Sequence, residues 1–132
     1  MKFVSTAFLA SDDDILLLKR PKDAPTYPSM WSAVSGFMEK GETPIEAAIR
    51  EVKEETGIAV DERNLAGVGV PFDVDSFRVH PHLFRTKRRD VTLCSENVEY
   101  RWVNPEEIKT LNTVSRLYEA LVSTDYFSTV TE

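Results

Sequence analysis

Three glutamates crowd one short stretch of the chain, REVKEETGI, which runs from Arg50 to Ile58. Glu51, Glu54 and Glu55 stand three and four residues apart, and on a helix like charges at this spacing repel by about 0.2–0.5 kcal/mol per pair. They would also lie near the C-terminal end of that helix, where the macrodipole favours cations. A bound divalent cation would offset both costs, and carboxylate oxygens are the ligands that Mg²⁺ takes. The stretch therefore indicates a metal site.

A helical projection places these glutamates beside the expected buried face. With 100° per residue and Glu51 at zero, the three carboxylates fall between about −60° and +40°. The apolar side chains fall between roughly 60° and 160°. They are Ile45, Ala48, Ile49 and Val52. The alternative interpretation is that the acidic stripe is only a solvated face, which is the usual role of surface glutamates.

The segment that carries the stripe has clear helix boundaries. Thr43 is a suitable N-cap, Pro44 suits the first helical position, and Glu46 completes a Thr-x-x-Glu capping box. Gly57 supplies a left-handed stop at the C-terminal end. These signals predict a helix from Pro44 to Thr56.

Hydrophobic runs and turn residues predict the other elements. Residues 2–10 and 14–20 flank the turn-like SDDD, which predicts an antiparallel pair of strands. We expect a loop over 21–30 and then a short strand from Trp31 that ends at Gly36. Further strands are expected within 58–74, 78–88 and 98–103, with a hairpin tip at 86–90 and a last helix over 114–122. Strands around a central helix, closed by a second helix, predict a mixed α/β sandwich.

Composition limits the class of protein. With 132 residues, 42% of them hydrophobic, the chain is expected to form one domain, residues 1–132, with its own core. A net charge of −6 argues against general nucleic-acid binding. No run approaches the roughly 18 apolar residues of a membrane span. The single Cys94 cannot form an intramolecular disulfide. We therefore expect no membrane association and a cytoplasmic location.

The spacing around the glutamates extends beyond the helix. From Gly36 to Ile58 the chain reads Gly-x5-Glu-x7-Arg-Glu-(apolar)-x-Glu-Glu-x-Gly-(apolar), with all nine positions filled. This pattern resembles the signature of the Nudix hydrolases (MutT-like), a family that cleaves nucleoside diphosphates linked to another moiety. The flanking segments DILLLKR, MWSAVSGF and VEYRWVNPEEI also resemble the family. One departure is Ser35, which stands where members often carry a glycine.

The resemblance implies a Nudix-type α/β/α sandwich with a mixed sheet, in which the signature holds the metal. Glu51, Glu54 and Glu55 would bind Mg²⁺, with Mn²⁺ as the alternative ion. Either Glu54 or Glu55 would also polarise the attacking water. Arg50 would orient a carboxylate, and its position four residues before Glu54 makes such a contact reasonable on a helix.

Residues around the helix supply the remaining candidates. The resemblance implies that Glu42 braces the loop and that Gly36 permits its turn, so both would support the bound cofactor. Glu39 is a candidate metal ligand, and Glu96 is a candidate catalytic or metal-bound residue, because some members use carboxylates at such positions. The alternative for both is a solvated surface glutamate.

Two basic groups are open to more than one interpretation. His80 and His82 could form a metal pair or supply a base, but the intervening Pro81 favours a polar face on an edge strand. The run from Lys87 to Arg89 could contact a substrate phosphate, or it could protect a sheet edge at the hairpin tip.

The expected reaction is attack of water on phosphorus in a small nucleotide, with release of a nucleoside monophosphate. The substrate stays open among ADP-ribose, nucleotide sugars and nucleoside triphosphates. Two other classes of protein remain: a catalytically silent nucleotide-binding sensor on the same fold, and an acidic interaction domain that needs no metal. The resemblance also makes a homodimer a reasonable expectation.

Overall fold

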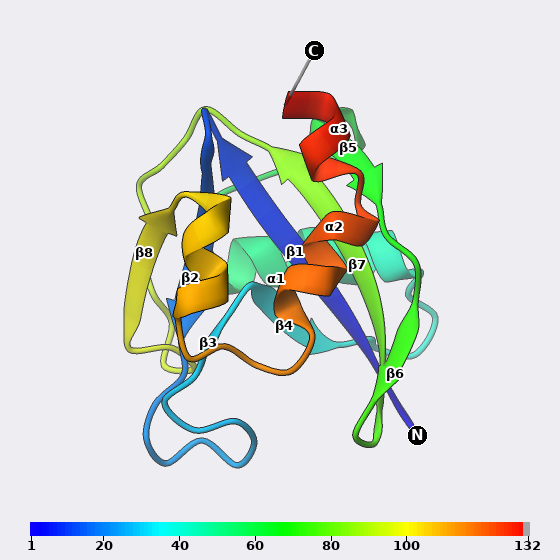
Figure 1. Ribbon diagram of the computed structural model, residues 1–132. Helices are drawn as coiled ribbons and strands as arrows, with labels where there is room; N and C mark the ends of the chain where they lie inside the picture. Colours follow the sequence, from blue (N-terminus) through cyan, green and yellow to red (C-terminus); the bar gives the residue numbers. More distant parts are fainter. Residues whose placement is uncertain (131–132) are drawn as a thin grey trace.

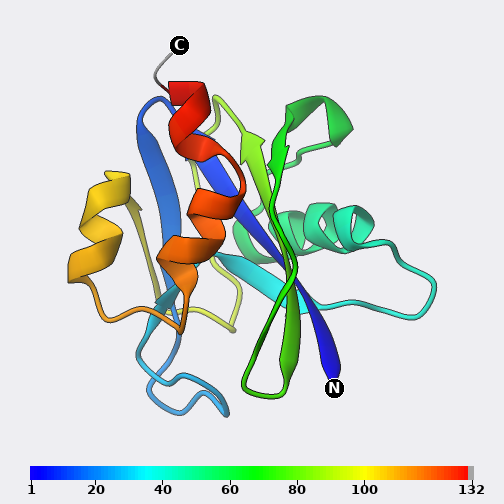
Figure 2. The ribbon, with the colours of Figure 1, turned by 45° about the vertical axis from the view of Figure 1, so that its right-hand side comes forward.

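A mixed sheet lies between two helical layers in the computed structural model, which describes residues 1–130 (Figure 1, Figure 2). Helix α1 (Pro44–Thr56) covers one face of the sheet. The short helices η2 (Pro105–Thr110), α2 (Leu117–Ser123) and α3 (Tyr126–Val130) cover the other face. This arrangement confirms the predicted sandwich. Within residues 1–130, no helix combines the length and the apolar character that a membrane crossing requires.

Strand β1 is the centre of the sheet. The strands that the structure describes are β1 (Lys2–Ser11), β2 (Asp14–Lys19), β3 (Trp31–Ser32), β4 (Val34–Phe37), β5 (Leu65–Val68), β6 (Phe72–Val74), β7 (Phe77–Arg85) and β8 (Glu99–Val103). β1 pairs in parallel with β7 and antiparallel with β2 and β4. Beyond these, β3 and β8 pair with β2, whereas β5 and β6 pair with β7. The predicted antiparallel pairing of the first two strands is confirmed.

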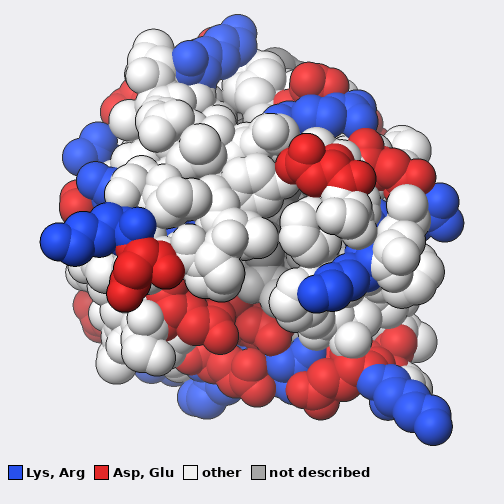
Figure 3. Space-filling model, turned by 90° about the horizontal axis from the view of Figure 1, so that it is seen from below, with Lys and Arg blue, Asp and Glu red and all other residues white. Residues whose placement is uncertain are grey.

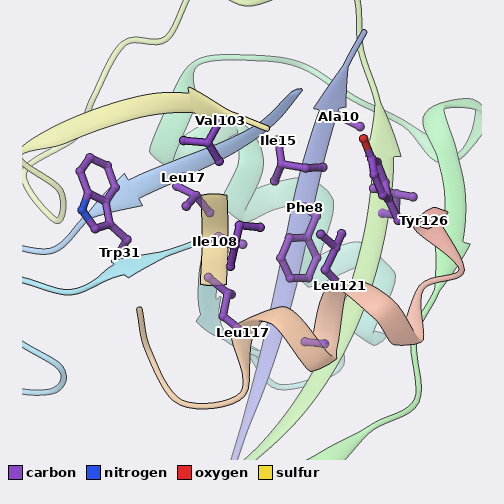
Figure 4. Packing of buried hydrophobic residues seen from close by; sticks show 13 residues of the cluster. Phe8, Ala10, Ile15, Leu17, Trp31, Val103, Ile108, Leu117, Leu121 and Tyr126 are labelled. Atoms are coloured by element: carbon purple, nitrogen blue, oxygen red, sulfur yellow. The ribbon is translucent and has the colours of Figure 1, made fainter. Parts of the chain in front are cut away.

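The core has two parts, one on each face of the sheet, because alternate side chains of β1 point in opposite directions. Phe8 and Ala10 belong to the cluster beneath α2 and α3 (Figure 4). Ala7 and Leu9 belong to the cluster beneath α1. Since β1 is covered on both faces, its nearly continuous apolar run is what a central strand requires.

Helix α1 begins and ends where the sequence predicts. The Thr43 hydroxyl accepts a hydrogen bond from Glu46 N, and the Glu46 carboxylate accepts one from Thr43 N, so the capping box is complete. At the other end Gly57 has a φ of 77°, and its N–H donates to Lys53 O. These local contacts fix which side chains of the helix face the sheet.

Two predicted strands are divided in the structure. The segment from Trp31 to Gly36 is not one strand, because its pairing partner changes from β2 to β1 at Ala33. β4 also continues to Phe37. The segment 58–74 contains only the short strands β5 and β6, preceded by a 3-10 turn, η1 (Glu62–Asn64).

The predicted hairpin tip at 86–90 is wrong. β8 pairs with β2, so residues 86–98 form a loop that crosses from β7 to the far side of β2. Arg89 anchors this loop by donating to Ser11 O at 3.0 Å and to Asp14 Oδ2 at 2.8 Å. Trp102 Nε1 in turn donates to Arg89 O at 3.2 Å. Arg89 therefore secures a crossover instead of protecting a hairpin.

His80 and His82 lie on an interior strand, which corrects the predicted edge position. β7 has β1 on one side and β5 and β6 on the other. Pro81 has no N–H to donate, but its carbonyl still accepts a hydrogen bond from Gly69 N at 2.9 Å. His82 is 2% exposed, and its burial lowers its pKa.

The last predicted helix starts too early. α2 begins at Leu117, because the residues before it pair with Trp31 in a short parallel bridge. Trp31 N donates to Asn112 O at 2.9 Å, and Val114 N donates to Trp31 O at 3.0 Å. Arg116 has a φ of 64°, a left-handed conformation that separates this paired segment from α2.

Candidate active site

Helix α1, strand β4 and the loop before β8 meet beside a cavity of about 810 Å³. Figure 3 looks onto this end of the molecule and shows acidic side chains gathered along one side of a hollow, with uncharged side chains along the other. The acidic residues that line the cavity are Asp23, Glu39, Glu51, Glu54 and Glu96. The volume lies in the range of pockets that hold small ligands.

Gly36 lets α1 and β4 approach each other at this end. It lies inside β4, and a Cβ at this position would overlap the carboxylate of Glu51. Glycine is needed here for close approach, because any side chain would displace that carboxylate. The predicted turn at Gly36 is therefore wrong. The glycines with positive φ are Gly41 and Gly57.

Arg50 joins several carboxylates into one network. Nε and Nη2 donate to the two oxygens of Glu42 at 2.7 and 2.9 Å, which is a bidentate pair. Nη1 donates to Glu51 Oε1 at 2.7 Å and to Glu54 Oε2 at 3.1 Å. Nη1 also lies 3.6 Å from Glu39 Oε2. One guanidinium thus ties the loop before α1 to the acidic side of the helix.

Glu42 is held as an anion by these contacts. Its Oε1 also accepts a hydrogen bond from Glu39 N at 2.8 Å, across the loop. The hydrogen bond from Arg50 lowers the pKa of Glu42 to about 2, and Glu42 in turn raises the pKa of Arg50. At neutral pH both groups are charged, so the loop is fastened to α1 by an ion pair.

Glu51, Glu55 and Glu96 form a second carboxylate group. Each offers one oxygen, and these three atoms lie within 4.8 Å of one another. Glu51 is 8% exposed and Glu55 is 4% exposed. Oε2 of Glu55 is buried and has no hydrogen-bond partner among the described residues. Burial, followed by the neighbouring Glu51, raises the pKa of Glu55.

This group fits a divalent cation. A buried carboxylate without a cation is costly, and the three oxygens are close enough to contact one ion. Oxygen-only donor sets suit Mg²⁺ or Mn²⁺. The interpretation of the acidic stripe as a solvated face is therefore wrong for Glu51 and Glu55, which are buried.

The carboxylate group differs in membership from the predicted metal set. Glu96 belongs to it, whereas within residues 1–130 Glu39 and Glu54 do not. The side chains of Glu39 and Glu54 are 65% and 55% exposed and lie on the Arg50 side. The helical projection explains why Glu55 is buried and Glu54 is exposed, because Glu54 falls farthest from the apolar face and Glu55 nearest to it.

Asn97 also belongs to the site, although no pattern in the sequence indicated it. It is 8% exposed, and its Nδ2 donates to Glu55 Oε1 at 3.1 Å. A lone asparagine after a glutamate carries no local signal, and the contact joins residues 42 positions apart.

Apolar side chains form another part of the cavity wall. They include Phe72, Val74, Phe77, Val79 and Leu117. At the rim, the Tyr27 hydroxyl donates to Asp75 Oδ2 and so connects the loop 21–30 to the turn between β6 and β7. Burial and then Asp75 raise the pKa of Tyr27 to about 12. The cavity thus combines an anionic side with a wall suited to a flat ring.

Comparison with known proteins agrees with this geometry. Residues 1–122 match the family model described as NUDIX domain. The structure is similar to that of a MutT protein from Methanosarcina mazei Go1, with a TM-score of 0.77 and 26% identity over 96% of this chain and 94% of that one.

Among the curated relatives with a named activity, two illustrate the range. The chain is 31% identical over 83 residues to a dihydroneopterin triphosphate diphosphatase from Haemophilus influenzae, which covers 63% of this chain and 49% of the relative. It is 43% identical over 60 residues to an ADP-ribose pyrophosphatase from Methanocaldococcus jannaschii, which covers 46% of this chain and 34% of the relative. The chain therefore spans half or less of the length of these two relatives.

Proposed function

Because the chain belongs to the Nudix family, we propose that it is a divalent-cation-dependent hydrolase that cleaves a pyrophosphate bond in a small nucleotide or nucleotide-like substrate. The observation that carries this proposal is the buried carboxylate of Glu55. Its Oε2 has no hydrogen-bond partner among the described residues, and it lies beside the carboxylates of Glu51 and Glu96. Such a group is unfavourable alone and favourable around an ion.

Each residue of the site would have a separate role. Glu51, Glu55 and Glu96 would hold Mg²⁺ or Mn²⁺, which neutralises phosphate charge and increases the acidity of water. Arg50 keeps Glu51 in place through the 2.7 Å hydrogen bond. Since Arg50 contacts Oε2 of Glu54, we assign Oε1 of Glu54 to accept the proton from the attacking water.

The reaction is a simple hydrolysis. The water oxygen forms a bond to one phosphorus, and the bridging P–O bond breaks. The departing phosphate oxygen keeps the bonding electron pair, while Glu54 receives the proton. A nucleoside diphosphate derivative would yield a nucleoside monophosphate and a second phosphorylated fragment, and a triphosphate would yield a monophosphate and pyrophosphate.

The apolar wall favours a substrate with a flat ring system. Both activities named for the relatives involve a phosphate anhydride attached to such a ring. Phe72, Phe77 and Leu117 offer a surface against which a pterin or purine would be desolvated. We therefore include dihydroneopterin triphosphate with ADP-ribose, nucleotide sugars and nucleoside triphosphates as candidate substrates.

A substrate panel tests the proposal. The purified protein is incubated with each compound and Mg²⁺ or Mn²⁺, and products are separated by ion-exchange chromatography. We expect cleavage of at least one anhydride, which is abolished by EDTA and by Glu51→Gln. Glu62→Gln, which changes an exposed glutamate outside the cavity, serves as the matched control and should be as active as the wild type. A folded protein that cleaves none of these compounds would favour the silent sensor instead.

A further inference from the structure

We propose that Asn97 is a positioning residue that assembles the cation site by fixing the carboxylate of Glu55 and, through the chain, the place of Glu96. The inference rests on the proposed use of a divalent cation. Asn97 is not itself a candidate ligand. It belongs to the crossing loop, residues 86–98, and not to the pattern from Gly36 to Ile58.

The two oxygens of Glu55 have different surroundings. Asn97 Nδ2 donates to Oε1 at 3.1 Å, whereas Oε2 is buried and has no partner among residues 1–130. A carboxylate with one oxygen tied in this way has a fixed orientation. The oxygen that remains is the one available to an ion, so Asn97 selects which atom faces it.

Backbone hydrogen bonds on both sides of Glu96 hold the loop in place. Asn97 N donates to Cys94 O at 3.3 Å, which closes a turn that has Glu96 at its third position. The next residue, Val98, donates its N–H to Lys19 O at 2.9 Å and fastens the loop to β2. Glu96 is exposed, so its position depends on these neighbouring anchors.

Val98 and Asn97 connect the loop to two different elements. Val98 joins the loop to the sheet, and the side chain of Asn97 joins it to helix α1 through Glu55. Glu51 and Glu55 come from that helix, while Glu96 comes from the loop. The Asn97 side chain thus connects the two parts that must come together for three carboxylates to meet.

Burial supports a specific function for this amide. Asn97 is 8% exposed, and an asparagine is seldom placed in an interior unless its amide is satisfied. Its partner is one of the candidate ligands and not a backbone group. Partners of this kind usually contribute 10–100-fold to metal affinity.

The test measures Mn²⁺ binding without substrate, by electron paramagnetic resonance of the free ion. Asn97→Leu keeps most of the side-chain volume but removes the donor, and Asn97→Ala removes both. We expect both variants to raise the Mn²⁺ dissociation constant by about 10–100-fold. Asn112→Leu makes the same change at an exposed asparagine outside the cavity, and it is the matched control that should bind as the wild type does.

Several results separate positioning from mere packing. If Asn97→Leu binds Mn²⁺ as the wild type does while Asn97→Ala does not, volume and not the hydrogen bond matters, and the inference is wrong. We also expect saturating Mn²⁺ to return the turnover number of Asn97→Leu to within a few-fold of the wild-type value. A turnover number that stays low at saturation would contradict an effect exerted through the metal. Glu55→Gln measured in parallel distinguishes the two proposals, since unchanged Mn²⁺ affinity in that variant would mean that the cation site itself is wrong.

Discussion

Glu42 and Glu55 are two carboxylates of the same site with opposite surroundings. Glu42 accepts hydrogen bonds from Nε and Nη2 of Arg50, and its pKa is lowered to about 2. Glu55 is more deeply buried, meets an amide instead of a cation, and has a raised pKa. On one side of Glu51 the protein supplies its own counterion, Arg50. On the other side, under the function proposed above, a divalent cation from solution would neutralise Glu55.

The largest effect is expected from Arg50→Leu, which removes the internal cation. Breaking a largely buried ion pair leaves carboxylates unpaired and costs about 3–5 kcal/mol. We expect the unfolding midpoint to fall by more than ten degrees and hydrolysis to be lost. Differential scanning calorimetry and a turnover assay measure the two effects. Arg50→Lys keeps the charge without the fork and should recover only part of each. Equal stability of Arg50→Leu and the wild type would show that the network has no structural role.

Gly36→Ala tests the carboxylate group of Glu51, Glu55 and Glu96. The added Cβ would displace the carboxylate of Glu51, and a shift of about 1 Å in a catalytic group can cost roughly 100-fold in rate. We expect kcat/KM to fall by that order. Gly41→Ala is the matched control: nothing lies within 4 Å of its added Cβ, but its φ of 86° makes alanine strained. It should lower stability while activity is kept. The reverse pattern would contradict the assigned role of Gly36.

Glu42→Gln tests the side with its own cation. A hydrogen bond to a charged group contributes about 2 kcal/mol, so this variant should be less stable by that amount at pH 7. The pKa of Glu42 is lower in the folded protein, about 2, than the roughly 4.3 of an unperturbed glutamate. Its contribution is therefore complete above pH 4.3 and is lost as the pH falls towards 2. Urea unfolding of both proteins from pH 7 to pH 3 should show the difference shrink. A constant difference would rule out ionisation as its source.

The smallest effect, and one of opposite sign, is expected from Glu55→Gln without metal. The pKa of Glu55 is raised in the folded protein. Above about pH 4.3 the unfolded chain therefore loses this proton while the folded protein retains it, so the free energy of unfolding falls as the pH rises. The metal-free variant should match the wild type near pH 4 and melt a few degrees higher at pH 8, since about 1 kcal/mol moves the midpoint of a domain this size by roughly 4 °C. Added Mn²⁺ should then stabilise the wild type and not the variant. A lower midpoint for the variant at pH 8 would contradict the comparison.

The sequence predicts α1 correctly because local signals determine its ends. It does not predict the crossing loop, residues 86–98, because distant contacts determine its path. Thr43, Pro44 and Gly57 determine the ends of α1 through contacts within four residues. The path of residues 86–98 depends on Arg89 and Asp14, which are 75 positions apart. A basic run before a strand resembles a hairpin tip whenever that partner is unknown.

The candidate site divides in the same way. Helical geometry places Glu51 and Glu55 beside the buried face, and both are buried. The positions of Glu96 and Asn97 depend on where the crossing loop lies, so periodicity gives no information on them. The side chain of Glu54 is 55% exposed, as its angle on the helix, farthest from the apolar face, predicts.

The parallel pairing of β1 with β7 has a consequence for the order in which the molecule assembles. Its partners run from Lys2 and Phe77 to Ala10 and Arg85, so each pair closes a loop of 75 residues. Pairings that are distant along the chain form late, whereas a capped helix such as α1 can form early. Because Gly36 lies in β4, which pairs with β1, we expect its close approach to Glu51 to form together with the sheet. A cation held by the completed site would therefore slow unfolding and leave the rate of refolding nearly unchanged.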